Sequence, residues 1–412
     1  MSLVKRAWRP FFGRAWKPLV FRDDNFVPLP VDRKVEEETL PDYVASRYYP
    51  VRIGEIFRAR YQVVGKLGFG ATSTVWLARD MRERRHVALK LFIDSESIGT
   101  EQDDELEFYK CIEASPKDHP GRSAVRSLLD SFDINGPNGR HRCLVHPPLW
   151  ETLLDVRHRN PIRRLPSPVM AFVLQRLFQA LDLLHTACHV AHTDIKEGNI
   201  LFAADDSVLR GFKEEELSKP CPRKELDGRT IYLTRELGTP KKVGAPVLCD
   251  FGSAVRLNDG TEHREDIQPN VYRAPEIILD IPWTYSVDIW NVGCMIWDAF
   301  EGEHLFTGQD PELETYRGRA HLAEMIALLG PPPPSLLARA NLRSKFFSAD
   351  GEFCAGIPIP EPTPLEHRET SLEGEEKECF LRFVRKMLQW EPEKRSSARE
   401  LAEDEWILMQ TK

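Results

Sequence analysis

The chain has 412 residues, of which 42% are hydrophobic and 29% are charged, and its formal net charge is −8. This length is enough for two folding units with cores of their own. No stretch approaches the roughly 20 uninterrupted apolar residues of a membrane-spanning helix, so we expect no membrane span. The acidic balance argues against a direct nucleic-acid partner. The 8 cysteines contain no Cys-x-x-Cys pair, which argues against a zinc site or disulfide framework and fits a reducing compartment.

Residues 1–60 separate into two parts. Residues 1–22 carry only basic charges together with several aromatic rings, which predicts a flexible basic tail. The alternative is an organelle transit peptide, which is also rich in arginine and poor in acids. Pro10 and Pro18 disfavour that alternative because proline breaks an amphipathic helix. Residues 23–60 contain several prolines and an acidic run, and predict an extended lead-in.

The next part of the chain has the period of β-structure. Residues 61–67 and 74–78 alternate between apolar and polar positions on either side of a glycine-containing turn, which predicts a hairpin. Residues 86–92 predict a third strand, residues 103–112 a helix, and residues 143–145 a short strand.

Beyond this point the apolar period becomes helical. Residues 168–187 place apolar side chains, Val169 and Phe172 among them, on one face of a predicted helix. Further helices are predicted over 286–300, 320–329 and 376–390, and Pro331–Pro334 predicts a polyproline spacer. Residues 203–247 are highly charged without a sustained period and predict an insertion. The expected fold class is therefore α+β, with a small β-rich lobe and a larger helical lobe.

A glycine-containing loop lies between the first two predicted strands. Glycine allows backbone N–H groups to approach phosphate oxygens closely, so the loop is a candidate nucleotide site. The alternative is an ordinary hairpin turn, since Ser73 stands where a third glycine is expected. The candidate nucleotide-binding residues here are Leu67, Gly68, Phe69, Gly70, Ala71, Thr72, Ser73, Thr74 and Val75.

Lys90 lies among apolar residues on the third predicted strand. A buried lysine needs a counter-ion, because an unpaired charge in a core costs several kcal/mol. Glu105 on the following helix is the favoured partner, with Asp104 and Glu107 as rivals. The pair is either structural or a device that directs Lys90 at the phosphates of a nucleotide.

The segment from His192 to Asn199 gathers a carboxylate, a cation and an amide within eight residues. Asp194 is a candidate catalytic base, and Lys196 can neutralise a transferring phosphoryl group. Asn199 and Asp250 offer hard oxygen ligands, which suit Mg²⁺. Each motif alone is compatible with a charged turn, but their order after a glycine loop and a buried lysine favours phosphoryl transfer.

These motifs resemble the signature set of the eukaryotic protein kinases. The resemblance covers about residues 61–408 and includes Ala274-Pro275-Glu276, Asp288 and Arg395. It implies a bilobal fold that uses ATP and Mg²⁺ to phosphorylate proteins, with Lys90, Glu105, Asp194 and Lys196 in catalysis. In this family the glutamate and arginine equivalent to Glu276 and Arg395 form a buried pair, while the aspartate equivalent to Asp288 braces the catalytic loop.

The resemblance also implies boundaries and an adenine site. The N-lobe is expected over 61–148 and the C-lobe over 149–408, with the insertion at about 203–247. His146 aligns with the gatekeeper position. Pro147 is then expected to offer its carbonyl and Leu149 its amide to adenine, against Ala88.

Among kinases, the chain is most similar to the SR-protein kinases of the CMGC group, particularly the fungal ones. Ser73, Thr193, the insertion and the run Gln268–Arg273 carry this resemblance. It implies a monomeric serine/threonine kinase of cytoplasm and nucleus, with basic Arg/Ser-rich splicing factors as expected substrates. The alternative location is the mitochondrion, through the basic N-terminus.

Thr193 replaces the arginine that grips an activation-loop phosphate in many kinases, which predicts activity without that phosphorylation. The alternatives are a pseudokinase scaffold, disfavoured because the lysine and both aspartates are present, and a small-molecule kinase, disfavoured by the late motifs. An acidic substrate groove is a further hypothesis, against the alternative of a solvated acidic loop. Its members are Glu301, Glu303, Asp310, Glu312 and Glu314.

Overall fold

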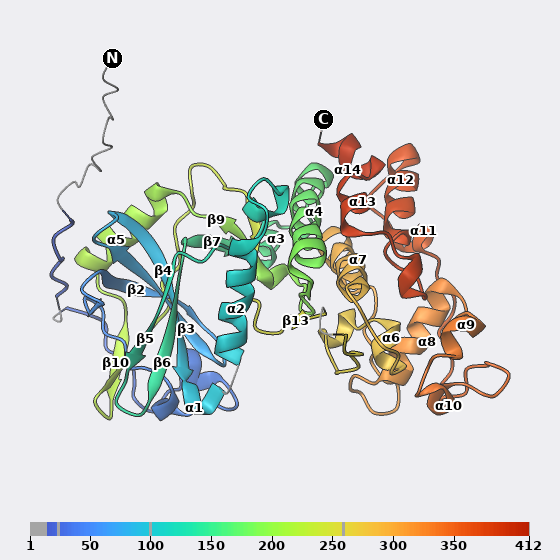
Figure 1. The fold of residues 1–412 in the computed structure, drawn as a ribbon, viewed down its shortest axis with the longest axis horizontal. Helices are drawn as coiled ribbons and strands as arrows, with labels where there is room; N and C mark the ends of the chain where they lie inside the picture. The colour runs from blue at the N-terminus through green and yellow to red at the C-terminus, as the bar shows by residue number, and fades with distance from the viewer. Residues whose placement is uncertain (1–14, 23–24, 99–100, 258–259, 412) are drawn as a thin grey trace, which may run out of the picture. The chain divides into compact units, whose positions relative to one another are not determined.

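A computed structural model describes residues 15–22, 25–98, 101–257 and 260–411 (Figure 1). The chain forms two compact units, each built from separate stretches of sequence. Unit 1 contains Met1–Gln102, Leu128–Leu149 and Ala204–Val243, and unit 2 contains Asp103–Ser127, Trp150–Ala203 and Gly244–Lys412. Unit 1 is rich in β-strands and unit 2 is mainly helical, which confirms the α+β class. Most of the basic segment 1–22 lies outside the described residues.

Unit 1 is built on an antiparallel sheet with the strand order β1-β2-β3-β4-β6-β5. The three strands expected at the start are confirmed, and their alternating apolar residues form a core that includes Tyr61, Trp76 and Leu89. β5 was not expected, because Phe132 and Ile134 are its only large apolar residues. The strands are β1 Ile56–Phe57, β2 Tyr61–Phe69, β3 Ser73–Asp80, β4 Arg85–Asp94, β5 Asp130–Asn135 and β6 Arg140–His146.

The insertion is an ordered part of unit 1. It contains the helix α5, Asp206–Ser218, and the hairpin of β10, Arg223–Leu226, with β11, Arg229–Tyr232. Asp205 caps the N-terminus of α5, and its side chain accepts hydrogen bonds from two backbone N–H groups. It lies alongside β2, and its Phe212 ring takes the space that a Cβ at Gly65 would need, only 2.8 Å from that position.

The lead-in also packs on unit 1. The glutamates of the short 3₁₀-helix Glu36–Thr39 neutralise two buried lysines. Lys66 pairs with Glu36 and Glu37, and Lys224 of the insertion hairpin pairs with Glu38 at 2.7 Å. The acidic run is therefore a set of buried counter-ions, which the sequence alone does not distinguish from a solvated one.

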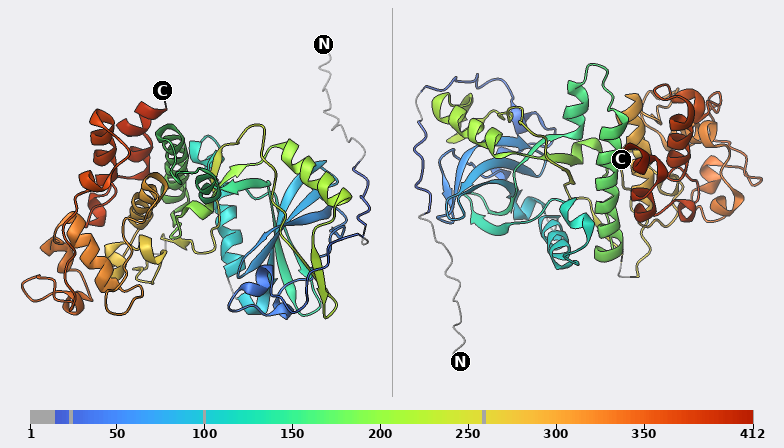
Figure 2. Two further views of the ribbon diagram at one scale, coloured as in Figure 1. Left: turned by 180° about the vertical axis from the view of Figure 1, so that it is seen from behind. Right: turned by 90° about the horizontal axis from the view of Figure 1, so that it is seen from above.

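Unit 2 surrounds α7, whose residues after Ser286 are all buried. α4 lies next to it and continues as a π-helix, Leu183–Cys188, that leads into the candidate catalytic segment (Figure 2). No helix among the described residues is long and apolar enough to cross a membrane. The helices are α1 Ser95–Ile98 (in unit 1), α2 Glu101–Ala114 (mostly in unit 2), α3 Leu153–Arg159, α4 Ser167–Asp182, α6 Pro275–Ile278, α7 Ser286–Glu301, α8 Gly318–Leu329, α9 Pro334–Leu337, α10 Arg343–Phe346, α11 Leu365–Arg368, α12 Gly374–Arg385, α13 Ala398–Ala402 and α14 Glu405–Gln410.

Three helical details differ from expectation. Val169 and Phe172 were expected on the buried face of α4 but are 40% and 42% exposed. The buried face is formed instead by residues such as Met170, Val173 and Leu177. α12 ends at Arg385, five residues before the end of the helix that the sequence predicts over 376–390. Pro334 begins α9, where proline is well tolerated, so the proline run is not wholly a spacer.

Two small sheets complete unit 2. Their orders are β12-β9-β7 and β13-β8. These strands are β7 Leu149–Thr152, which begins at the end of unit 1, β8 Val190–Ala191, β9 Ile200–Ala203, β12 Pro246–Leu248 and β13 Val255–Arg256.

If α5 belongs to the core of unit 1, Phe212→Ala should lower the free energy of unfolding by about 3–5 kcal/mol, because it leaves a cavity against β2. Urea denaturation measures this change. The matched control is Glu214→Ala, an exposed position on the same helix, which should change the value by less than about 0.5 kcal/mol. Equal, small effects of the two substitutions would show that α5 is only peripheral.

Candidate active site

The glycine loop in unit 1 has free space beside both of its glycines. Gly68 lies near the end of β2 and Gly70 lies in the turn before β3, and a Cβ at either position would meet no heavy atom of the described residues within 4 Å. Phe69 at the tip is 38% exposed. The loop therefore leaves its backbone accessible to a ligand, as a phosphate-binding role requires.

The register of the sheet places the candidate lysine beside this loop. Val75 of β3 is the cross-strand partner of Lys90 in β4, so both side chains lie on one face of the sheet. Ala88 lies two residues earlier in the same strand and therefore shares that face. Within unit 1, the structure thus brings together the loop, Val75, Ala88 and Lys90.

The candidate hinge follows the sheet. β6 ends at His146, which is fully buried and pairs with Ala88 in the register. Pro147 and Pro148 separate it from Leu149, where β7 begins. The expected roles of the Pro147 carbonyl and the Leu149 amide stay predictions.

The candidate base in unit 2 lies within a dense hydrogen-bond network. Lys196 Nζ donates to Asp194 Oδ2 at 2.7 Å, and Asn199 Nδ2 donates to the same oxygen at 2.9 Å and to the Asp194 carbonyl at 2.9 Å. The Asp194 side chain remains 19% exposed, so its carboxylate is fixed but accessible. Such a fixed, accessible carboxylate can orient a hydroxyl and accept its proton.

A single buried carboxylate fixes the backbone just before this base. Asp288 of α7 accepts the backbone N–H groups of His192 and Thr193 at 2.8 Å each, and His185 Nε2 lies 2.9 Å from it. This confirms the expectation that Asp288 braces the catalytic loop. Thr193 has a positive φ of 66°, a strained conformation for a β-branched residue that surrounding contacts must impose.

The two candidate metal ligands are neighbours through strand register. Ile200 pairs with Leu248 in the β9–β12 ladder, and the Cys249 N–H donates to the Asn199 carbonyl at 2.8 Å. Asn199 precedes one strand and Asp250 follows the other, so the ladder holds them side by side. The Asn199 bonds to Asp194 use its nitrogen and leave its oxygen, the metal-binding atom, to other partners. The residues therefore fit Mg²⁺, which prefers carboxylate and carbonyl oxygen.

Glu105 lies on the buried side of α2 at 2% exposure. Its Oε2 is 4.0 Å from the Cβ position of Gly252, next to Asp250. On the same helix, the Tyr109 ring packs edge-to-face on Phe251 at a centroid distance of 5.2 Å. Lys90 belongs to unit 1 and Glu105 to unit 2, so the Lys90–Glu105 pair stays a prediction.

The expected buried pair of Glu276 and Arg395 is confirmed. Arg395 donates to both oxygens of Glu276 at 2.6 and 2.7 Å, and neither side chain is exposed. A fork-to-fork pair of this kind is directional as well as strong. It fixes α6, directly after the segment that borders Asp194.

A cavity of about 520 Å³ lies against the candidate base. Its walls are the catalytic segment and a second segment that precedes α6. The lining residues are Thr193, Asp194, Lys196, Ser253, Asp266, Ile267, Gln268 and Pro269. The space suits a peptide whose hydroxyl must reach Asp194.

Sequence reasoning missed two supports of this site. The sequence indicates Gln268 only as the start of the run Gln268–Arg273. In the structure its side-chain amide donates to Val287 and Asn291 and accepts from the Ala274 N–H, so it connects the cavity wall to α7 and α6. Arg157 forms a buried bidentate pair with Glu197, and burial raises the Glu197 pKa while Arg157 opposes that rise. The sequence offers one signal for this structural role, which is that Glu197 lies inside the catalytic segment.

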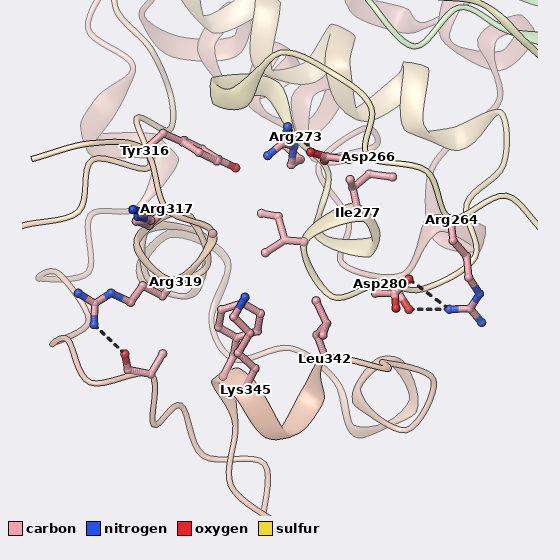
Figure 3. Close-up of a pocket in the computed structure, with 14 residues that line it drawn as sticks. Arg264, Asp266, Arg273, Ile277, Asp280, Tyr316, Arg317, Arg319, Leu342 and Lys345 are labelled. Atoms are coloured by element: carbon pink, nitrogen blue, oxygen red, sulfur yellow. Dashed lines mark hydrogen bonds and ion pairs between the residues drawn. The ribbon is translucent and has the colours of Figure 1, made fainter. Parts of the chain in front are cut away.

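A second cavity, of about 580 Å³, shares Asp266 with the first and is strongly basic (Figure 3). Three of its arginines have acidic partners: Arg264 with Asp280, Arg273 with Asp266, and Arg319 with Asp310. Among the described residues, Arg317 and Lys345 form no ion pair with a carboxylate. The cavity therefore has positive charge left for an anionic group.

The acidic-groove hypothesis is wrong for its central members. Glu301 is buried, accepts a hydrogen bond from Thr370 at 2.9 Å and pairs with Arg164 at 3.5 Å. Asp310 is buried under Arg319, which lowers the Asp310 pKa to about 2, and Arg319 also pairs with Glu312. These carboxylates are already neutralised within the fold, so they do not form a groove for basic peptides.

Comparisons with known proteins show which family the chain resembles. The family model of the protein kinase domain matches residues 61–407. A serine/threonine protein kinase of Aspergillus fumigatus is 43% identical over 390 residues, which cover 94% of each chain. The serine/threonine-protein kinase SRPK of Physarum polycephalum is 30% identical over 397 residues, covering 90% of this chain and 91% of that protein. Protein kinase dsk1 of Schizosaccharomyces pombe is 25% identical, covering 91% and 85%.

The domain match extends over most of the chain, and the similarity to the fungal and slime-mould kinases over nearly all of it. The chain therefore belongs to the protein kinase family and is a serine/threonine protein kinase of the SR-protein kinase group.

Proposed function

We propose that this kinase transfers the γ-phosphate of ATP to serine in Arg/Ser-rich proteins of the splicing-factor type. The observation that best supports phosphoryl transfer is the fixed Asp194 carboxylate beside Lys196 and Asn199, at the wall of an open cavity. The substrate class rests on the similarity to the kinase named SRPK and to relatives named SRSF protein kinase.

Each group has a distinct role in this proposal. Asp194 orients the serine hydroxyl and accepts its proton, while Lys196 balances charge on the transferring phosphoryl group. Lys90 and the glycine loop hold the phosphates, with Glu105 as the counter-ion of Lys90. Asn199 and Asp250 would hold Mg²⁺, which neutralises the phosphate oxygens when bound.

The basic cavity refines the substrate proposal. Arg317 and Lys345 disfavour an arginine side chain at this cavity and favour a carboxylate or a phosphoserine. Because Asp266 lines both cavities, the anion would lie a short distance along the substrate from the serine at Asp194. A repeat of arginine and serine supplies such an anion once a neighbouring serine has been phosphorylated.

Thr193 supports activity without a phosphate switch. Its hydroxyl donates to the Ser253 carbonyl at 2.6 Å, directly after the metal-binding segment. In kinases that are switched on by phosphorylation, an arginine–phosphate contact orders the activation loop. Here the uncharged hydrogen bond from Thr193 joins the catalytic segment to Ser253 without a phosphate. The pseudokinase alternative has no support.

The location in cytoplasm and nucleus is also a proposal, as is the monomeric state. Arg/Ser-rich substrates of splicing are found in those compartments. Imaging of tagged full-length and N-terminally truncated protein distinguishes this location from the mitochondrial alternative.

Asp194→Asn should lower kcat by about 100- to 10,000-fold, because the hydroxyl loses its proton acceptor. The dissociation constant for ATP, measured by calorimetry, should change less than twofold. Asp118→Asn, at an exposed position of unit 2, is the matched control and should keep wild-type kcat. A variant at Asp194 with near wild-type kcat would reject the assignment of the base.

A peptide-array screen with purified protein should show a preference for arginine near the target serine, and an added preference for a nearby phosphoserine. Lys345→Glu should reduce the phosphoserine preference about tenfold by removing a charge-assisted contact. Lys117→Glu makes the same charge change at an exposed position elsewhere in unit 2 and should leave it intact. Indifference to arginine would reject the splicing-factor substrate class, and indifference to phosphoserine would reject the role of the basic cavity.

A further inference from the structure

The glycine loop is held from outside by a tyrosine of the lead-in. Tyr48 precedes β1 and is 4% exposed. Its hydroxyl donates to the Ala71 carbonyl at 2.9 Å and lies 3.2 Å from the Gly70 carbonyl. Gly70 and Ala71 are two of the three residues, 70–72, in the turn between β2 and β3.

The chemistry of this contact makes it directional. Burial, reinforced by Glu37, raises the Tyr48 pKa to about 12, so the hydroxyl is protonated at neutral pH and acts as the donor. Carbonyls that are held on one side of a tight loop restrict the directions of its neighbouring N–H groups. Tyr48 therefore restricts the backbone that a phosphate ligand would meet.

Tyr48 is in turn held by the insertion. Arg229 of the β10–β11 hairpin donates to the Tyr48 carbonyl at 2.8 Å and lies 5.8 Å from its ring centroid. Arg229 also binds the Ala45 carbonyl, so the lead-in backbone is fixed at two points. The insertion therefore helps to hold the backbone and the ring of Tyr48 in place.

A second contact acts on the same loop. The Lys66 ammonium lies 5.2 Å from the centroid of the exposed Phe69 ring, and Lys66 is held in place by Glu36 and Glu37 of the lead-in. The lead-in therefore supports the loop both at its tip and at its turn.

We propose that Tyr48 is a positioning residue for the ATP phosphates, acting through the carbonyls of Gly70 and Ala71. The inference rests on the proposed binding of ATP by the glycine loop. It makes the lead-in and the insertion working parts of the nucleotide site.

Tyr48→Phe tests this directly, because it removes one hydroxyl and keeps the ring. We expect KM for ATP to rise about fivefold, the scale of one hydrogen bond, with the peptide KM unchanged. The melting temperature should fall by no more than about 2 °C. Tyr43→Phe is the matched control: its ring lies 5.2 Å from that of Tyr48, and its buried hydroxyl has no hydrogen-bond partner among the described residues.

A binding comparison separates positioning from general damage. In calorimetry, Tyr48→Phe should weaken ATP about fivefold and leave adenosine, which has no phosphates, unchanged. Equal losses for ATP and adenosine, or no loss for ATP, would overturn the inference. A wild-type protein that binds ATP but phosphorylates no serine or threonine would instead reject the proposed function and leave the Tyr48 comparison readable.

Discussion

The conformation of the catalytic segment in unit 2 depends on one buried carboxylate. Asp288 is fully buried on α7 and accepts two backbone N–H groups from His192 and Thr193. Hydrogen bonds to a charged acceptor contribute about 1.5–3 kcal/mol each, which is enough to hold the positive φ of Thr193. Asp194 follows immediately, so its direction is a consequence of this grip. The motif Asp-Ile-Trp is therefore as much a part of the catalytic segment as the base itself.

Two further constraints complete the arrangement. The β9–β12 ladder fixes Asn199 beside Asp250, so strand register rather than loop conformation positions the two candidate metal ligands. In unit 1, the glycine loop is supported by Tyr48 and Lys66, which contact segments outside the sheet. Rigid elements thus hold the catalytic and metal residues, while the phosphate loop takes its support from added segments.

Much of the fold followed from local pattern. Period-2 alternation predicted the strands around the glycine loop, and helical period predicted α4, α7 and α8, because burial of one face dictates these patterns. The order of Lys90, Asp194, Asn199 and Asp250 predicted the chemistry without any contact information. The structure places these residues on strands and in the segments beside them, while the roles of all four, and of Glu105, stay predictions.

The charged segments were the part that sequence did not resolve. Glu36–Glu38 and the insertion carry charges that are buried against distant partners, and composition alone gives the same pattern for a solvated loop. The error at Glu301 and Asp310 has the same cause, since Arg164 and Arg319 pair with them from other segments. Long-range partners of charged residues are fixed by the fold, and no local period reports them.

We infer that Asp288 and Thr193 keep the base ready without an activating phosphate. The most direct measurement is the kcat of protein made in bacteria and treated with phosphatase, with mass spectrometry to verify the absence of phosphate. We predict that this kcat lies within about twofold of the untreated value, because no charged grip at Thr193 is lost. A loss of tenfold or more that is reversed by rephosphorylation would show that the base depends on an activating phosphate.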